Sequence, residues 1–93
     1  MTAAEKLSVL KMDLQMLTAA NDDYLTLLLQ QAEKAIATEG IKVVEGDTEC
    51  EMAVIQYAAY LFRKRAAEET AMPRYLRYLL NNILFSQKAG GNS

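Results

Sequence analysis

The chain has 93 residues, enough for one domain with a modest hydrophobic core and too few for two. Apolar residues make up 52 %, but no apolar run reaches the ~20 residues that a helix needs to cross a bilayer, so no membrane partner is expected. The net charge of −2 excludes a uniformly basic nucleic-acid binder, and the start of the chain lacks the features of a signal peptide, which indicates synthesis in the cytoplasm without export.

The sign of the charge changes along the chain. Residues 1–51 hold ten acidic and four basic side chains, whereas residues 52–93 hold two acidic and six basic ones. Opposite fields on the two halves would favour one mutual orientation of two copies. Chance, together with the preference of acids for helix starts and of bases for helix ends, explains the same distribution. Both interpretations stay open at this point.

A first helix is predicted near the start of the chain. Thr2 and Glu5 have the spacing of a capping box, and the helix extends to about Leu14. The connection from Gln15 to Ala20 is weakly patterned and contains neither glycine nor proline. One helix face carries Ala3, Leu7, Leu10 and Leu14, and the other carries Val9, Met12 and Met16.

The second predicted helix is the most clearly amphipathic one. Asn21 or Asp22 is expected to cap it, and it runs from about Asp22 to Glu39, before Gly40. Its apolar face consists of Tyr24, Leu25, Leu28, Leu29, Ala32, Ala35 and Ile36.

The segment 41–47 interrupts the helical pattern. Its β-branched residues favour extended backbone, and Gly46-Asp47 favours a turn. The segment is predicted to be either a short strand or an ordered loop. A strand here would need a pairing partner that the rest of the chain does not offer, such as another subunit.

The chain is organised around the stretch from Thr48 to Arg65. Thr48 and Glu51 again have capping-box spacing, and the basic residues 63–65 suit the negative end of a helix dipole. We expect a helix from about Glu49 to Thr70, ended by the restriction that Pro73 places on the residue before it.

This central helix is apolar on nearly all sides. One face carries Val54, Ile55, Ala58, Leu61 and Phe62. The opposite face carries Met52, Gln56, Ala59, Tyr60 and Arg63. Either its own domain covers the whole helix, or the face with Met52, Tyr60 and Arg63 meets a second copy or a partner.

The last predicted helix runs from Pro73 to about Gln87. Its core face carries Leu76, Leu79, Leu80, Ile83 and Leu84, and its far side carries Arg74, Tyr78, Asn81 and Phe85. Aromatic side chains beside arginine are typical of contact surfaces, although they also lie along the surface of isolated domains. Residues 89–93 are expected to form a disordered tail, so the single domain covers residues 1–88.

The residue inventory argues against an enzyme. The chain has no histidine, and Cys50 alone cannot build a structural zinc site. The glycines at 40, 46, 90 and 91 do not form a phosphate-binding loop. The pair Asp22-Asp23 fits a helix start better than a metal site. No catalytic residue, cofactor or metal is therefore predicted.

Basic residues gather where the last two predicted helices meet. Arg63-Lys64-Arg65, Arg74 and Arg77 could contact phosphates, although no helix has the Asn/Gln/Arg face that reads bases. Alternatively they form a solvated or salt-bridged end. A small helical regulatory DNA-binding protein therefore stays as an alternative, and so does a helical adaptor that binds one partner helix.

Three stretches, taken in order, resemble a known family. Asp22–Ile36 has an acidic start followed by L-x-x-L-L-x-x-A, Ala53–Arg65 reads A-V-x-x-x-A-x-x-L-F-x-x-R, and Met72–Asn82 is a turn with a leucine-rich helix. This order, over about residues 5–87, is similar to that of the head–tail connector (adaptor, or head-completion) proteins of tailed bacteriophages and prophages.

The resemblance implies a structural virion protein at the head–tail junction. Such a subunit forms a ring of about a dozen copies beneath the portal protein and carries the next connector or tail proteins, and DNA passes through the ring without sequence recognition. We therefore expect an all-α domain, a small bundle of about four helices with a long central third helix, in which the acidic half of one copy faces the basic half of the next. The predicted contact residues are Met52, Tyr60, Arg63, Arg74, Tyr78 and Phe85.

Overall fold

The computed structural model describes residues 1–66 and 71–90. In these ranges the chain forms four helices and no strand, namely α1 (Ala3–Asp13), α2 (Asp22–Thr38), α3 (Thr48–Ala66) and α4 (Arg74–Gly90). The predicted all-α bundle with a long central third helix is confirmed. Within the same ranges, no helix combines the length and the apolar character needed to span a membrane.

The helix boundaries differ from the prediction by three residues at most where the structure describes them. The largest difference is at the end of α4, which continues to Gly90, so Ala89 and Gly90 are helical and not part of a tail. The predicted extension of the third helix over 67–70 and the tail residues 91–93 lie outside the described residues.

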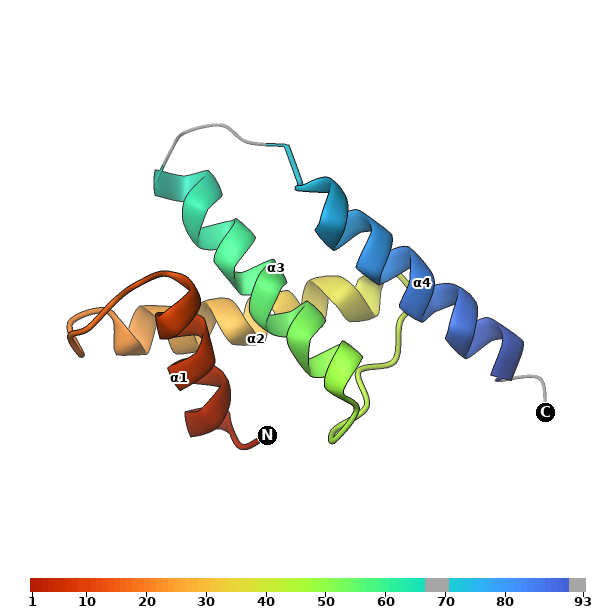
Figure 1. The fold of residues 1–93 in the computed structure, drawn as a ribbon, viewed down its shortest axis with the longest axis horizontal. Coiled ribbons are helices and arrows are strands. Elements are labelled where there is room, and N and C mark those ends of the chain that lie inside the picture. Colours follow the sequence, from red (N-terminus) through yellow and green to blue (C-terminus); the bar gives the residue numbers. More distant parts are fainter. Residues whose placement is uncertain (67–70, 91–93) are drawn as a thin grey trace.

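The central element is α3, which packs against each of the other three helices (Figure 1). α2 crosses behind it, α1 lies on one side, and α4 runs antiparallel to it on the other side (Figure 1). α1 and α2 also contact each other. Several small side chains of α2 and α3 are completely or almost completely buried, which lets helix backbones approach closely. They are Ala32, Ala53, Ala58 and Ala59.

Two predicted helix caps differ in the structure. The capping box of α1 is confirmed, because Thr2 Oγ1 accepts a hydrogen bond from the Glu5 backbone. At α3, however, the capping residue is Asp47 and not Thr48, since Asp47 Oδ1 accepts from the Cys50 backbone at 3.2 Å. At α2, Asn21 occupies the cap position without a side-chain capping bond, and Asp22 forms an ion pair with Lys11 at 2.9 Å.

The segment 41–47 is an irregular loop, and Lys42 in it is paired within the chain. The Gln87 side chain of α4 donates to the Lys42 carbonyl at 2.6 Å and accepts from the Lys42 N–H at 2.8 Å. One amide side chain thus supplies both hydrogen bonds that a neighbouring strand would give. The loop therefore needs no strand from another subunit, and Ile41 is free to bury its side chain in the core.

Two helices end in a residue with left-handed backbone. Gly40 follows α2 with φ of 96°, whereas Gln15 follows α1 with φ of 58°. At both ends an N–H bonds back over five residues, from Met16 to Lys11 at 2.9 Å and from Ile41 to Ile36 at 3.4 Å. A residue with a Cβ is strained by ~1–2 kcal/mol in this conformation. The end of α1 is therefore strained and the end of α2 is not.

Replacing Gln15 with glycine should raise the free energy of unfolding by about 1 kcal/mol, because relief of strain exceeds the added entropy of the unfolded chain. Gly40→Ala should lower the free energy of unfolding by about 1 kcal/mol. The new Cβ would meet Leu84 at an ordinary 3.7 Å, so the cost comes from the left-handed backbone and not from a clash. Urea denaturation measures both changes. Gln15→Ala keeps the strain and serves as the control. Equal stability of Gln15→Gly and Gln15→Ala would show that this backbone is not strained.

Candidate subunit and partner interface

The outer face of α4 carries three exposed aromatic side chains. Leu76, Leu80 and Ile83 bury the inner face. On the side turned away from the core, three aromatic side chains are more than half exposed, namely Tyr75 at 53 %, Tyr78 at 61 % and Phe85 at 67 %. We call Arg74, Tyr75, Tyr78 and Phe85 the α4 face.

The structure places Arg74, Tyr78 and Phe85 on this surface, as helical periodicity predicts, and their role as contact residues stays a prediction. Tyr75 belongs to the same surface and was not predicted. It lies one turn before Tyr78, and that i, i+3 spacing was the available signal.

Polar contacts at both ends of α4 fix which side faces outward. Near its start, the Arg77 guanidinium binds both carboxylate oxygens of Glu39 at 2.8 and 3.2 Å. Near its end, Gln87 binds the Lys42 backbone as described above. The hydrogen bond to Glu39 holds the pKa of Arg77 above its already high ordinary value. Rotation of α4 about its axis would break these contacts, so the aromatic side chains are held in an outward orientation.

The predicted contact face of α3 is largely covered by the domain itself. Ala59 is completely buried, and Met52 and Tyr60 are half-buried and pack against the core. Arg63 is exposed and binds Asp13 of α1, with 3.1 Å between Nη2 and Oδ2. The expectation that this face lacks cover within the domain is therefore wrong at its centre, because the other helices enclose the middle of α3. Only its rim is available to a partner.

Most of the basic cluster already has internal partners. Lys64 lies 5.8 Å from the centre of the Tyr60 ring, and Arg65 lies 5.5 Å from that of the Tyr24 ring. Arg63 and Arg77 form the ion pairs given above. Among the described residues, Arg74 is the member of the cluster without such a partner. The predicted pairing of Arg65 with Glu68 or Glu69 lies outside the described residues.

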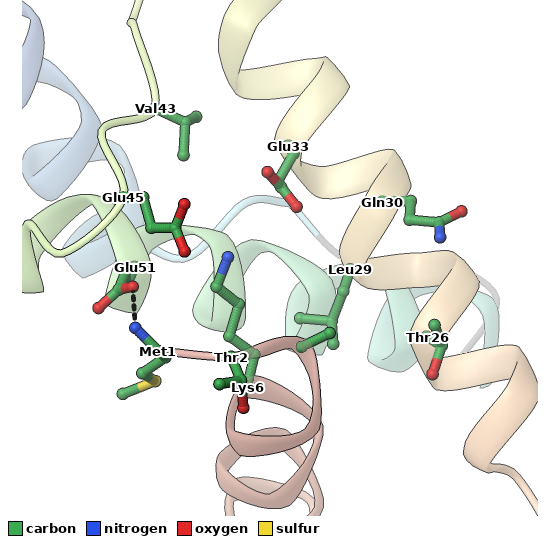
Figure 2. A pocket seen from close by; sticks show the side chains of 11 residues that line it. Met1, Thr2, Lys6, Thr26, Leu29, Gln30, Glu33, Val43, Glu45 and Glu51 are labelled. Atoms are coloured by element: carbon green, nitrogen blue, oxygen red, sulfur yellow. Dashed lines mark hydrogen bonds and ion pairs between the residues drawn. The ribbon is translucent and has the colours of Figure 1, made fainter.

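A polar cavity of about 360 Å³ lies between the start of α1, the middle of α2 and the loop at 43–45. Figure 2 shows Lys6 reaching toward the side of the cavity that holds Glu33, Glu45 and Glu51. Within the described residues, no three histidine, cysteine or acidic side chains are placed so that they could hold a metal ion. The cavity lining contains no serine, cysteine or histidine.

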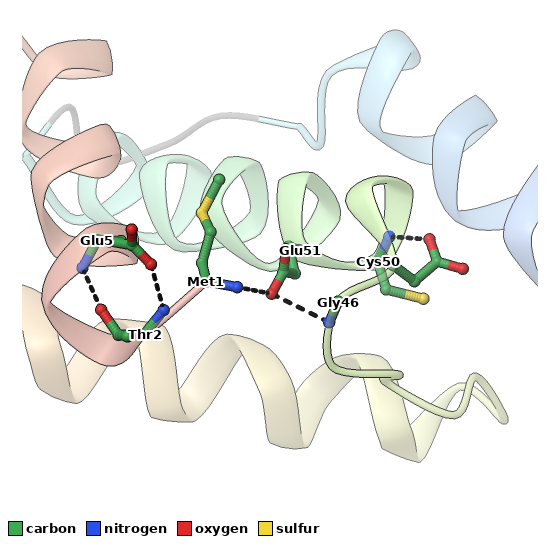
Figure 3. A network of polar contacts seen from close by, with 7 residues as sticks. Met1, Thr2, Glu5, Gly46, Cys50 and Glu51 are labelled. Atoms are coloured by element: carbon green, nitrogen blue, oxygen red, sulfur yellow. Dashed lines mark hydrogen bonds and ion pairs between the residues drawn. The ribbon is translucent and has the colours of Figure 1, made fainter.

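Glu51 is buried, with 4 % exposure, in a polar network beside this cavity (Figure 3). Its carboxylate forms an ion pair with the ammonium of Met1 and accepts a hydrogen bond from the Gly46 N–H at 3.3 Å. The bond to the ammonium is the main reason why the pKa of Glu51 lies below its ordinary value, and burial acts in the opposite direction. The ion pair of Glu51 with the amino terminus was not predicted, because the sequence spacing assigned Glu51 to a capping box with Thr48.

Comparisons of the chain with family models, with curated proteins and with solved structures find no match. The resemblance to connector proteins therefore rests on the order of the three helical patterns.

The lowered pKa of Glu51 predicts a pH-dependent stability difference. Ionised Glu51 stabilises the fold fully above the ordinary carboxyl pKa of 4.5, and this contribution is lost as the pH falls through the lower folded-state value. Glu51→Gln should therefore be less stable than the wild type at pH 7, and the difference should shrink as the pH falls below 4.5. Urea denaturation over this pH range measures it.

The control is Glu49→Gln, which changes an exposed carboxylate two residues away and should alter stability little at any pH. A deficit of Glu51→Gln that is the same at low and neutral pH would show that the charge of Glu51 does not stabilise the fold.

Proposed function

We propose that the chain is a ring-forming head–tail connector of a tailed phage or prophage. In this role it is a structural subunit that joins the portal to the next connector or tail proteins, at the head–tail junction of the virion, and DNA passes through the ring without sequence recognition. The observation that carries the proposal is the α4 face, where three aromatic side chains share one exposed helix surface with Arg74, which has no ion-pair partner among the described residues. Aromatic residues and arginine are the types most enriched at protein contacts.

The family resemblance supplies the specific assembly. It implies a small helical subunit, and the four-helix domain centred on α3 agrees with that expectation. The resemblance also supplies the number of copies, about a dozen, and the portal as partner. The fold alone would fit many helical binding proteins.

The physical logic of a ring suits a subunit of this size. A standard interface uses ~800 Å² from each partner, and a ring subunit has two of them, which is about a quarter of the 6079 Å² accessible surface of this chain. Each contact is then modest. Closure of the ring lets every contact support its neighbours, so that a stable assembly results from weak pairs.

The DNA-binding alternative receives less support from the structure. It depends on Arg63, Arg74 and Arg77, and two of these three form ion pairs with Asp13 and Glu39. Contact with phosphates would have to compete with those pairs. A helical adaptor with one partner helix would also use the α4 face, and the composition of the assembly distinguishes it from a ring.

Tyr78→Ser combined with Phe85→Ser should weaken self-assembly at least tenfold and leave the fold intact, because both side chains are mostly exposed in the monomer. Sedimentation and native mass spectrometry, with and without a portal protein, measure assembly, and circular dichroism measures helicity. Leu27→Ser combined with Val44→Ser is the matched control, since it removes exposed apolar side chains elsewhere and should leave assembly unchanged.

Two results would contradict the proposal. Loss of helicity in the Tyr78/Phe85 double variant would show that these residues are core. A protein that stays monomeric with portal and retards duplex DNA at physiological salt would instead be the DNA-binding regulator, and Arg74→Gln should then weaken that binding.

A further inference from the structure

Two further exposed apolar side chains lie toward the opposite end of the molecule from α4. Met12, in the last turn of α1, is 70 % exposed, and Leu17, in the connection to α2, is 98 % exposed. We call residues 12–23 the α1 corner. The longest extent of the chain is 45 Å, and Figure 1 shows the α1 corner and α4 toward opposite ends of this axis.

We propose that the α4 face of one copy docks on the α1 corner of the next copy, so that the copies join head to tail. This inference rests on the proposed function for its occupant, a second copy of the chain. It adds the surface that receives the α4 face.

The side chains of the two surfaces are chemically matched. The thioether of methionine makes favourable contacts with aromatic rings, often at the ring edge, and it adapts to irregular surfaces. Met12 would lie against the rings of Tyr78 or Phe85. Leu17, almost fully exposed in the single subunit, would be removed from water by the same contact.

The charges of the two surfaces are opposite. Residues 12–23 contain three acidic side chains and no basic one, whereas α4 contains three basic side chains and no acidic one. Internal ion pairs use Asp13, Asp22 and Arg77. Asp23 then faces outward on one surface, and Arg74 and Lys88 face outward on the other.

The same charges disfavour the simplest alternative. Two α4 faces in contact would bring together Arg74 and Lys88 of both copies, which have no ion-pair partner within residues 1–66 and 71–90, and like charges at a contact repel. A contact between two different surfaces at opposite ends is heterologous and repeats from copy to copy. It gives a ring when the rotation between copies closes, as the proposed function requires.

Complementation between two defective variants tests the proposal. The first variant, Tyr78→Ser with Phe85→Ser, lacks the α4 face and keeps the α1 corner. The second, Met12→Ser with Leu17→Ser, lacks the corner and keeps the α4 face. Each alone should fail to assemble. Their mixture should form a one-to-one pair and stop there, because each pair retains only one intact contact. Native mass spectrometry with one variant isotopically labelled identifies the pair.

A second measurement detects the same contact directly in solution. A nitroxide on Thr18→Cys marks the corner, and Cys50, at 2 % exposure, is shielded from the label. The spin-labelled variant, at natural isotope abundance, is mixed with ¹⁵N-labelled wild-type protein. We expect broadening of α4 amides between 74 and 86 in the ¹⁵N copy. A nitroxide on Gln31→Cys, exposed on α2 and ~12 Å along that helix from the end of the corner, is the comparison and should broaden them less.

The outcomes separate this inference from the proposed function. Normal assembly of the Met12/Leu17 variant, or no broadening of α4 from the Thr18 label, overturns the head-to-tail contact even if rings form on a portal. Formation of the mixed pair together with α4 broadening supports the contact. If the wild type nevertheless forms no ring with any portal, the contact holds and the connector function is wrong.

Discussion

The enclosure of α3 by its own domain is the constraint on which the rest of the structure depends. Fully buried alanines on both sides of the helix let the neighbouring backbones approach, and the large apolar side chains fill the space between them. A helix covered in this way has little surface to offer to another molecule. Any association would therefore use the elements packed around α3. Among the described residues, exposed large apolar side chains lie on α4, at the end of α1 and in the connection that follows it, and also at Met1, on α2 and in the loop after α2.

The second constraint is how α4 is held. Apart from its packing on α3, it is fixed by two polar contacts that reach back to the end of α2 and to the loop after it, through Arg77 and Gln87. Neither contact adds much stability, since ion pairs and hydrogen bonds near solvent each contribute about 1 kcal/mol or less. Their effect is geometric. They oppose rotation of the helix about its axis, so that the same three rings face outward.

The helices could be predicted from the sequence because helical spacing of apolar residues and the signals that start and stop a helix are local, even though the third helix is apolar on nearly all sides. The features that were missed are non-local or ambiguous. Asp47 and Thr48 are both good caps, and the T-x-x-E spacing favoured the wrong one. Alanine gives no sign of facing inward or outward, so the burial of Ala59 was not predicted. The pairing of Gln87 with Lys42 joins residues 45 positions apart and leaves no local pattern. Periodicity predicted which residues lie on the outer side of α4. The exposure of Leu17 depends on the turn at Gln15, which no glycine or proline in the sequence indicates.

The turn at Gln15 also affects how much conformational freedom the connection after α1 keeps. The left-handed backbone of Gln15 lies between Met12 and Leu17, and it sets the direction in which the chain leaves α1. A glycine would keep the turn with less strain, but it would also let the following residues sample more conformations. Ordering them again on contact with a neighbour would then have an entropic cost of ~1 kcal/mol or more per residue. The strained residue thus narrows the backbone conformations of the connection that carries Leu17, at a cost in stability that a glycine would remove.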